Sequence, residues 1–149
     1  MRAVVLAALL ALAAQTSSGL AGTWTLDPAG RGGRGNFAGY STATRMVIAE
    51  SATEVTIQTN TGIENQLVAA TYRLDGSENP VPGPLGWDTR ASARRQDGNL
   101  VVTIKRSIDG PEGKVNFEIR DVYTVAGNVL TLERSQGSRS QKMLYNRVC

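Results

Sequence analysis

Short stretches in which apolar and polar residues alternate constrain this chain more than any other feature. Residues 54–59 are an example, because Val55 and Ile57 alternate with polar neighbours. Turn signals such as Asp97-Gly98 separate these stretches, roughly every 8–12 residues. A period of two puts one set of side chains on one face of a strand. The pattern predicts an all-β fold of about eight or nine antiparallel strands.

The order of the expected strands favours an antiparallel up-and-down β-barrel. Consecutive hairpins suit a meander, and a closed barrel removes exposed sheet edges. An immunoglobulin-like sandwich is the alternative, but Cys149 is the single cysteine, so the usual disulfide is absent. Pro28 is expected to end the first strand, because proline cannot donate to a ladder. The glycine-rich segment 29–40 is then a loop that could serve as a lid.

The N-terminal residues are expected to lie outside this domain. Arg2 precedes an unbroken apolar run that ends at Ala14, with small residues suited to cleavage after Ala13 or Ala14. These features predict a signal peptide over 1–14 and a single barrel domain over 15–149. The run is short for a membrane span, which needs about 20 apolar residues. We therefore expect a periplasmic or secreted protein with no transmembrane span in its mature form.

Charge and cysteine content limit the partners of the chain. The formal net charge is +3, and the basic residues are dispersed among acids, so no nucleic-acid partner is expected despite the Arg-Gly-Gly-Arg-Gly sequence at 31–35. A monomer is expected, with a dimer through Cys149 as the alternative. One group of charged residues could bind an anion at the barrel mouth or simply form a solvated outer face: Asp88, Arg90, Arg94 and Arg95.

The sequence contains no histidine, which removes the usual Ser-His-Asp triad and a common metal ligand. We therefore expect no catalytic residues, no metal site, no cofactor and no enzymatic activity. The alternative is an enzyme that uses carboxylates or a lysine inside the barrel. Glu118 and Asp121 have opposite parity on one stretch, so they should face opposite ways. The other candidates have no spacing that recommends them: Glu133, Lys105, Lys114 and Lys142.

Several short motifs together resemble small exported bacterial proteins with a lipocalin-like (calycin-type) barrel and no settled role. They are Gly22-Thr-Trp-Thr-Leu-Asp-Pro28, Tyr72–Gly76, Asp97–Ile104, Leu130–Arg134 and the terminal Tyr145-Asn-Arg147. The resemblance implies that Arg147 lies across Trp24 and closes one end of the barrel. A guanidinium over an indole face is a favourable cation–π contact, worth roughly 0.5–2 kcal/mol. Gly22, Trp24 and Arg147 are therefore structural candidates.

Binding of a small, mostly apolar molecule inside the barrel is the function that this pattern favours. Thr89, Ala91 and Ala93 form one unusually small inward face, which favours a cavity. The alternative is a filled barrel core in a structural or interaction module that acts through its surface, at the cell envelope. The candidate ligand-binding residues are the larger inward side chains: Met46, Tyr72, Trp87, Phe117 and Tyr145.

Overall fold

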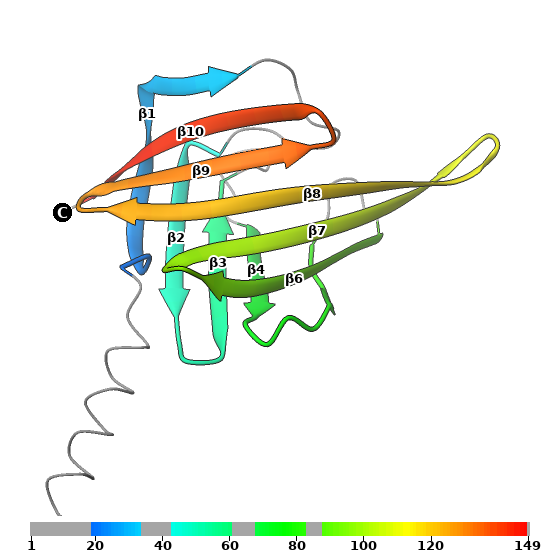
Figure 1. Ribbon diagram of the computed structural model, residues 1–149, viewed down its shortest axis with the longest axis horizontal. Helices are drawn as coiled ribbons and strands as arrows, with labels where there is room; N and C mark the ends of the chain where they lie inside the picture. Colours follow the sequence, from blue (N-terminus) through cyan, green and yellow to red (C-terminus); the bar gives the residue numbers. More distant parts are fainter. Residues whose placement is uncertain (1–18, 34–42, 61–67, 83–87, 149) are drawn as a thin grey trace, which may run out of the picture.

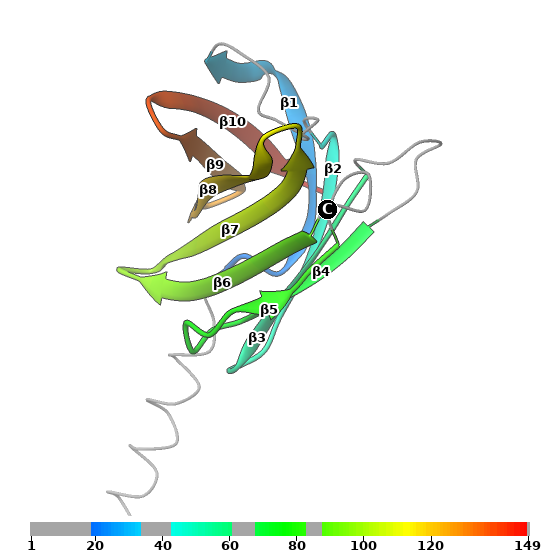
Figure 2. The same ribbon diagram turned by 90° about the vertical axis from the view of Figure 1, so that its right-hand side faces the viewer.

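The computed structural model describes residues 19–33, 43–60, 68–82 and 88–148. These residues form one antiparallel sheet that curls into a nearly closed barrel (Figures 1 and 2). Neighbours in the sheet are neighbours in the chain, except that β1 pairs with β10. The strands are β1 (Gly22–Gly33), β2 (Arg45–Glu50), β3 (Glu54–Thr59), β4 (Val68–Arg73), β5 (Asn79–Pro80), β6 (Asp88–Gln96), β7 (Asn99–Gly110), β8 (Gly113–Ala126), β9 (Val129–Gln136) and β10 (Arg139–Arg147).

The antiparallel up-and-down barrel expected from the sequence is confirmed, with ten strands instead of eight or nine. No helix occurs in the described parts of the chain, and accordingly none that is long and apolar enough to cross a membrane. The extra strand is β5, which is only two residues long and lies in a proline-rich stretch. The predicted hairpin at Asp97-Gly98 is present, and both residues have positive φ angles, 54° and 82°, as a tight hairpin turn requires.

The first strand is longer than expected. Pro28 was expected to end it, but β1 continues to Gly33. The ladder to β10 is interrupted instead, because Leu26 pairs with Tyr145 and the next pair is Arg31 with Met143. Pro28 lies within that interruption, so its missing N–H removes no ladder hydrogen bond. Residues 29–33 of the predicted loop therefore belong to β1, and residues 34–40 lie outside the described residues.

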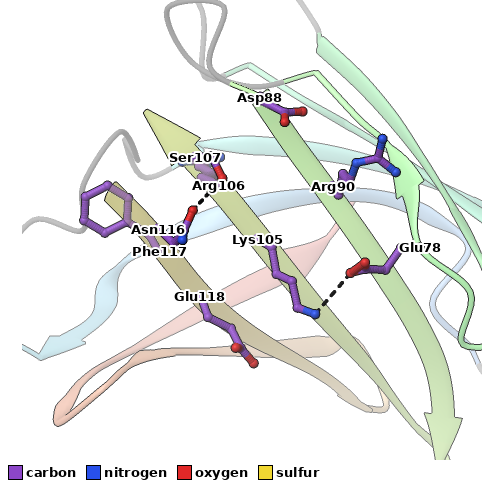
Figure 3. Close-up of a pocket in the computed structure, with 9 residues that line it drawn as sticks. All are labelled: Glu78, Asp88, Arg90, Lys105, Arg106, Ser107, Asn116, Phe117 and Glu118. Carbon is purple, nitrogen blue, oxygen red and sulfur yellow. Dashed lines mark hydrogen bonds and ion pairs between the residues drawn. The ribbon is translucent and has the colours of Figure 1, made fainter. Parts of the chain in front are cut away.

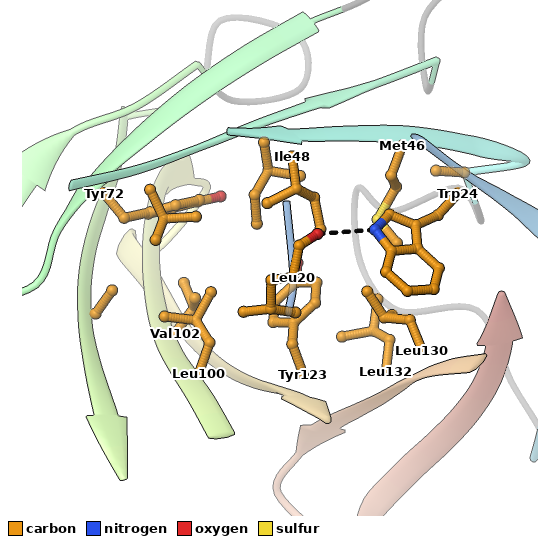
Figure 4. Packing of buried hydrophobic residues seen from close by; sticks show 14 of the residues in the cluster. Leu20, Trp24, Met46, Ile48, Tyr72, Leu100, Val102, Tyr123, Leu130 and Leu132 are labelled. Atoms are coloured by element: carbon orange, nitrogen blue, oxygen red, sulfur yellow. Dashed lines mark hydrogen bonds between the residues drawn. The ribbon is translucent and has the colours of Figure 1, made fainter. Parts of the chain in front are cut away.

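The two ends of the barrel differ in what they contain. The start of β1 and the β2–β3, β6–β7 and β8–β9 turns share one end, which we call the Trp24 end. The β7–β8 and β9–β10 turns share the other, which we call the Arg106 end. Buried apolar side chains fill the interior around Trp24 (Figure 4). The core includes Leu20, Trp24, Met46, Ile48, Val55, Ile57, Tyr72, Leu100, Val102, Ile104, Ile119, Tyr123, Leu130, Leu132, Met143 and Tyr145.

Strand β5 is one edge of the sheet and contacts β4, the other edge. Asn79 pairs with Ala91 of β6, and its side-chain Nδ2 donates to the backbone oxygen of Thr71 in β4, at 2.8 Å. The Val81 N–H donates to the Thr89 oxygen at 3.0 Å. These bonds connect β4 to β6, so the seam between them is bridged by a short strand and one amide side chain.

Candidate functional site

Arg147 and Trp24 meet at the Trp24 end as the sequence suggested. The guanidinium carbon of Arg147 lies 4.3 Å from the centre of the Trp24 ring, which is fully buried. The same guanidinium donates to the backbone oxygens of Ala21, at 2.9 Å, and Gly19, at 2.7 Å. Trp24 Nε1 donates to the Leu20 oxygen at 2.8 Å. The pair therefore holds residues 19–21 across this end of the barrel as well as stacking on each other.

Gly22 is needed at this position for a steric reason. Its φ is +141°, and a Cβ on it would lie 2.8 Å from Nη1 of Arg147. A larger residue would therefore strain the backbone and push the guanidinium off the ring. Gly22, Trp24 and Arg147 form one structural unit.

A second contact at the Trp24 end involves Arg95, one of the candidates for an anion site. Arg95 Nη2 lies 2.9 Å from Glu50 Oε1, and Glu50 Oε2 accepts from the Ala21 N–H at 3.1 Å. Arg95 is half-buried and lies on the inward-facing side of β6. Its ion pair with Glu50 is therefore inside the Trp24 end of the barrel. The other three members of that group, Asp88, Arg90 and Arg94, are exposed, which favours the solvated outer face.

Toward the Arg106 end the interior becomes polar. One buried polar or charged side chain comes from each of five successive strands, β6 to β10. We call this set the polar interior layer: Thr89, Arg106, Asp121, Arg134 and Gln141. The register divides the layer into two groups. Asp121, Arg134 and Gln141 are direct neighbours across β8, β9 and β10, and Arg106 is the direct neighbour of Thr89. The second group lies nearer the β7–β8 turn, because Asp121 pairs with Val102 and Arg106 pairs with Phe117.

Asp121 and Arg134 of the polar interior layer form a two-point ion pair. Arg134 Nε donates to Asp121 Oδ1 at 2.9 Å, and its Nη2 donates to Oδ2 at 3.1 Å. The Asp121 side chain is 1% exposed. Such a fork geometry is the strongest form of a charge-assisted hydrogen bond. The layer contains two arginines, Arg106 and Arg134, and one aspartate, Asp121.

Sequence reasoning placed Asp121 on the face opposite to that of Glu118 but missed its partner. The signal was available, because Arg106, Arg134 and Gln141 all have the inward parity of their strands. The expected separation of Glu118 and Asp121 is present, since Glu118 is exposed and Asp121 is buried. Glu133, Lys105, Lys114 and Lys142 are also exposed, and the described residues contain no cluster of three or more potential metal ligands.

The five predicted ligand-binding residues do not form one group. Met46, Tyr72 and Tyr145 are buried in the apolar core, and the Tyr145 hydroxyl donates to the Ala43 oxygen at 2.7 Å. Phe117 is half-buried and pairs with Arg106 near the Arg106 end. Trp87 lies outside the described residues. Their role in binding a ligand stays a prediction.

An open groove of about 440 Å³ lies near the Arg106 end, over β6, β7 and β8 (Figure 3). Its lining mixes charges of both signs, and Lys105 Nζ lies 3.1 Å from Glu78 Oε2 across it. Most of its side chains belong to the outer face, but Arg106 also belongs to the polar interior layer. The lining residues are Glu78, Asp88, Arg90, Lys105, Arg106, Ser107, Asn116, Phe117 and Glu118.

Comparison with known proteins identifies the fold. No protein-family profile matches the sequence, and no curated protein sequence is significantly similar to it. A secretory abundant heat soluble (SAHS) protein from Ramazzottius varieornatus superposes with a TM-score of 0.66 at 16% identity, over 90% of this chain and 98% of the other. The chain has a lipocalin-like barrel fold.

Two further solved structures share this lipocalin-like barrel. Fatty-acid-binding protein 1 from Echinococcus granulosus superposes with a TM-score of 0.62 at 12% identity, over 87% of this chain and 98% of the other. Human cRBP IV superposes with a TM-score of 0.59 at 19% identity, over 87% and 98% of the two chains. At these identities the likeness concerns the fold, and the calycin-type barrel suggested by the terminal motifs is thereby confirmed.

Proposed function

We propose that this protein binds a small, mostly apolar molecule inside its barrel, with an acidic group of the ligand at the polar interior layer. The observation that carries the proposal is the burial of five polar or charged side chains on the inner face of five successive strands. An interior that combines apolar walls with a few convergent polar groups is the usual composition of a small-molecule site.

Stability alone does not account for the polar interior layer. Taking charges out of water is costly, and replacing a buried ion pair by apolar residues of similar size is often neutral or stabilising. Arg106 adds a second buried guanidinium to the layer, on a strand that also lines the groove. Guanidinium groups in the layer favour an acidic head group, because charge-assisted hydrogen bonds to a carboxylate are strong and directional.

The fold comparison supports the same class of ligand. Proteins with this barrel include one described as a fatty-acid-binding protein and another described as a fatty acid transporter. A fatty acid has an apolar chain for the core side of the barrel and a carboxylate for the arginines. On this proposal the protein is a carrier without enzymatic activity. The apolar run over residues 3–14 supports a periplasmic or extracellular location.

Calorimetric titration of the lipid-stripped protein tests the proposal. The two ligands are a long-chain fatty acid and the primary alcohol of the same chain length. A hydrogen bond to a charged group contributes about 1.5–3 kcal/mol. Arg106→Met should therefore lower the affinity for the fatty acid about tenfold or more and leave the affinity for the alcohol nearly unchanged. Arg90→Met is the matched control, because Arg90 lies on the outer face of the neighbouring strand.

Two results would contradict the proposal. If Arg106→Met lowers the affinities for the acid and the alcohol equally, this arginine does not bind the head group. Failure of the parent protein to bind either ligand, with its fold intact, would instead favour the filled-core module that acts through its surface.

A further inference from the structure

A buried hydrogen-bond acceptor lies at the end of β9, beside the β9–β10 turn. The side-chain oxygen Oε1 of Gln136 is buried and accepts no hydrogen bond from the described part of the chain. A buried polar atom without a partner lowers stability, and folded proteins contain few such atoms. The position of this oxygen therefore calls for a role that the folded chain alone does not supply.

The register places the Gln136 side chain on the inner face of the barrel, at the Arg106 end. Gln136 follows Arg134 by two residues on β9, so the two side chains point to the same face, about 7 Å apart along the strand. Across the β9–β10 ladder, Arg139 is the direct partner of Gln136, and Gln141 is the direct partner of Arg134. Gln136 therefore extends the polar interior layer toward the β9–β10 turn.

This acceptor and the arginine of the proposed head-group site belong to strands on either side of β8. Arg106 comes from β7 and Gln136 from β9, so their inward side chains approach a head group from two directions. A guanidinium donates hydrogen bonds, whereas the Gln136 oxygen only accepts them. An ionised carboxylate also only accepts, so a plain fatty acid can bind Arg106 but offers nothing to Gln136 Oε1.

We propose that the ligand of the barrel is an acid with a hydrogen-bond donor close to its carboxylate, and that Gln136 Oε1 accepts from that donor. This inference rests on the proposed function and specifies its ligand class. Hydroxylated fatty acids and fatty acids joined through an amide to an amino acid share the required chemistry. Gln136 selects them over the plain fatty acid, because a ligand without the donor leaves a buried polar atom of the site unpaired.

Calorimetric titration with three probes tests the proposal. The probes are a long-chain fatty acid, the same acid with a hydroxyl group on its third carbon, and the same acid joined through an amide to glycine. The parent protein should bind at least one donor-bearing acid about tenfold more tightly than the plain acid, and the preferred probe identifies the donor as hydroxyl or amide. Gln136→Met should remove this preference and leave the affinity for the plain acid nearly unchanged. Gln96→Met is the matched control, because Gln96 is exposed at the Trp24 end, and it should keep the preference.

The possible results separate this inference from the proposed function. If the parent protein binds all three acids equally and Gln136→Met changes none of the affinities, the Gln136 oxygen takes no part in binding. The inference is then wrong, while the carrier function stands. If Gln136→Met lowers all three affinities equally, the amide donates to the carboxylate instead, which also overturns the inference. A folded parent protein that binds none of the three acids overturns both the inference and the proposed function.

The stability of the ligand-free protein is a second measurement that needs no ligand. Methionine is similar in size to glutamine but has no strong hydrogen-bonding atom, so Gln136→Met removes the unpaired acceptor. Urea denaturation should therefore find this variant at least as stable as the parent protein. A clear loss of stability would mean that the Gln136 oxygen has its partner within the folded chain, and the inference would be wrong.

Discussion

Removal of one partner of the Asp121–Arg134 ion pair is expected to lower the free energy of unfolding more than removal of any other polar side chain. Both side chains are buried, and their two hydrogen bonds place opposite charges in direct contact. Arg134→Met keeps much of the volume but leaves the Asp121 charge buried without its partner, so the free energy of unfolding should fall by about 3–5 kcal/mol. Urea denaturation at neutral pH measures the change.

The double variant Asp121→Leu/Arg134→Met is the control for this prediction. It removes both charges, so it should recover most of the stability lost in Arg134→Met. If the double variant is less stable than the single one, the pair contributes net stability. The argument that the polar interior layer is retained for a ligand then loses its main physical support.

At the scale of one element, β5 depends on a single side chain to join the edges of the sheet. Asn79→Ala removes the hydrogen bond from Nδ2 to the Thr71 oxygen, which should lower the free energy of unfolding by about 1 kcal/mol. Amide exchange in β4 and β5 should accelerate more than exchange in β9, which is paired with β8 on one side and β10 on the other. Asn146→Ala, on the exposed face of β10, is the matched control. Uniform acceleration over all strands would contradict a local seam.

The other elements show what a sequence pattern can and cannot predict. Alternation predicted β2–β4 and β6–β10 and their inward faces, because those strands lie between an apolar interior and water. It did not predict β5, which is too short to show a period, or the part of β1 beyond Pro28. The polar interior layer was also missed as a group, because a polar residue of inward parity becomes meaningful only when the register places it beside others. The Asp121–Arg134 contact is a property of that register.

At the scale of the whole molecule, the barrel is asymmetric along its axis. The Trp24 end is covered by residues 19–21, which accept hydrogen bonds from Trp24 and Arg147 and donate one to Glu50. The Arg106 end holds the polar interior layer and the groove. On the proposed function, a ligand that enters near the Arg106 end would meet the polar interior layer first and apolar walls deeper inside. This arrangement suits a molecule whose acidic group stays near the entrance.

Residues 19–21 should accordingly be an integral part of the folded protein, although they precede the first strand. A chain that begins at Gly22 lacks the buried Leu20 side chain and the backbone acceptors of Trp24 Nε1 and Arg147. Loss of a buried leucine costs about 2–5 kcal/mol, and the buried indole N–H loses its partner as well. Thermal unfolding should therefore occur at a clearly lower temperature than in a chain that begins at Gln15.

A chain that begins at Gly19 keeps all of these contacts, so its unfolding temperature should match that of the chain that begins at Gln15. If the chain from Gly22 is equally stable, the stack of Arg147 on Trp24 closes the barrel without this segment. The expected cleavage after Ala13 or Ala14 leaves residues 19–21 in place, so removal of the leader and closure of the Trp24 end are compatible.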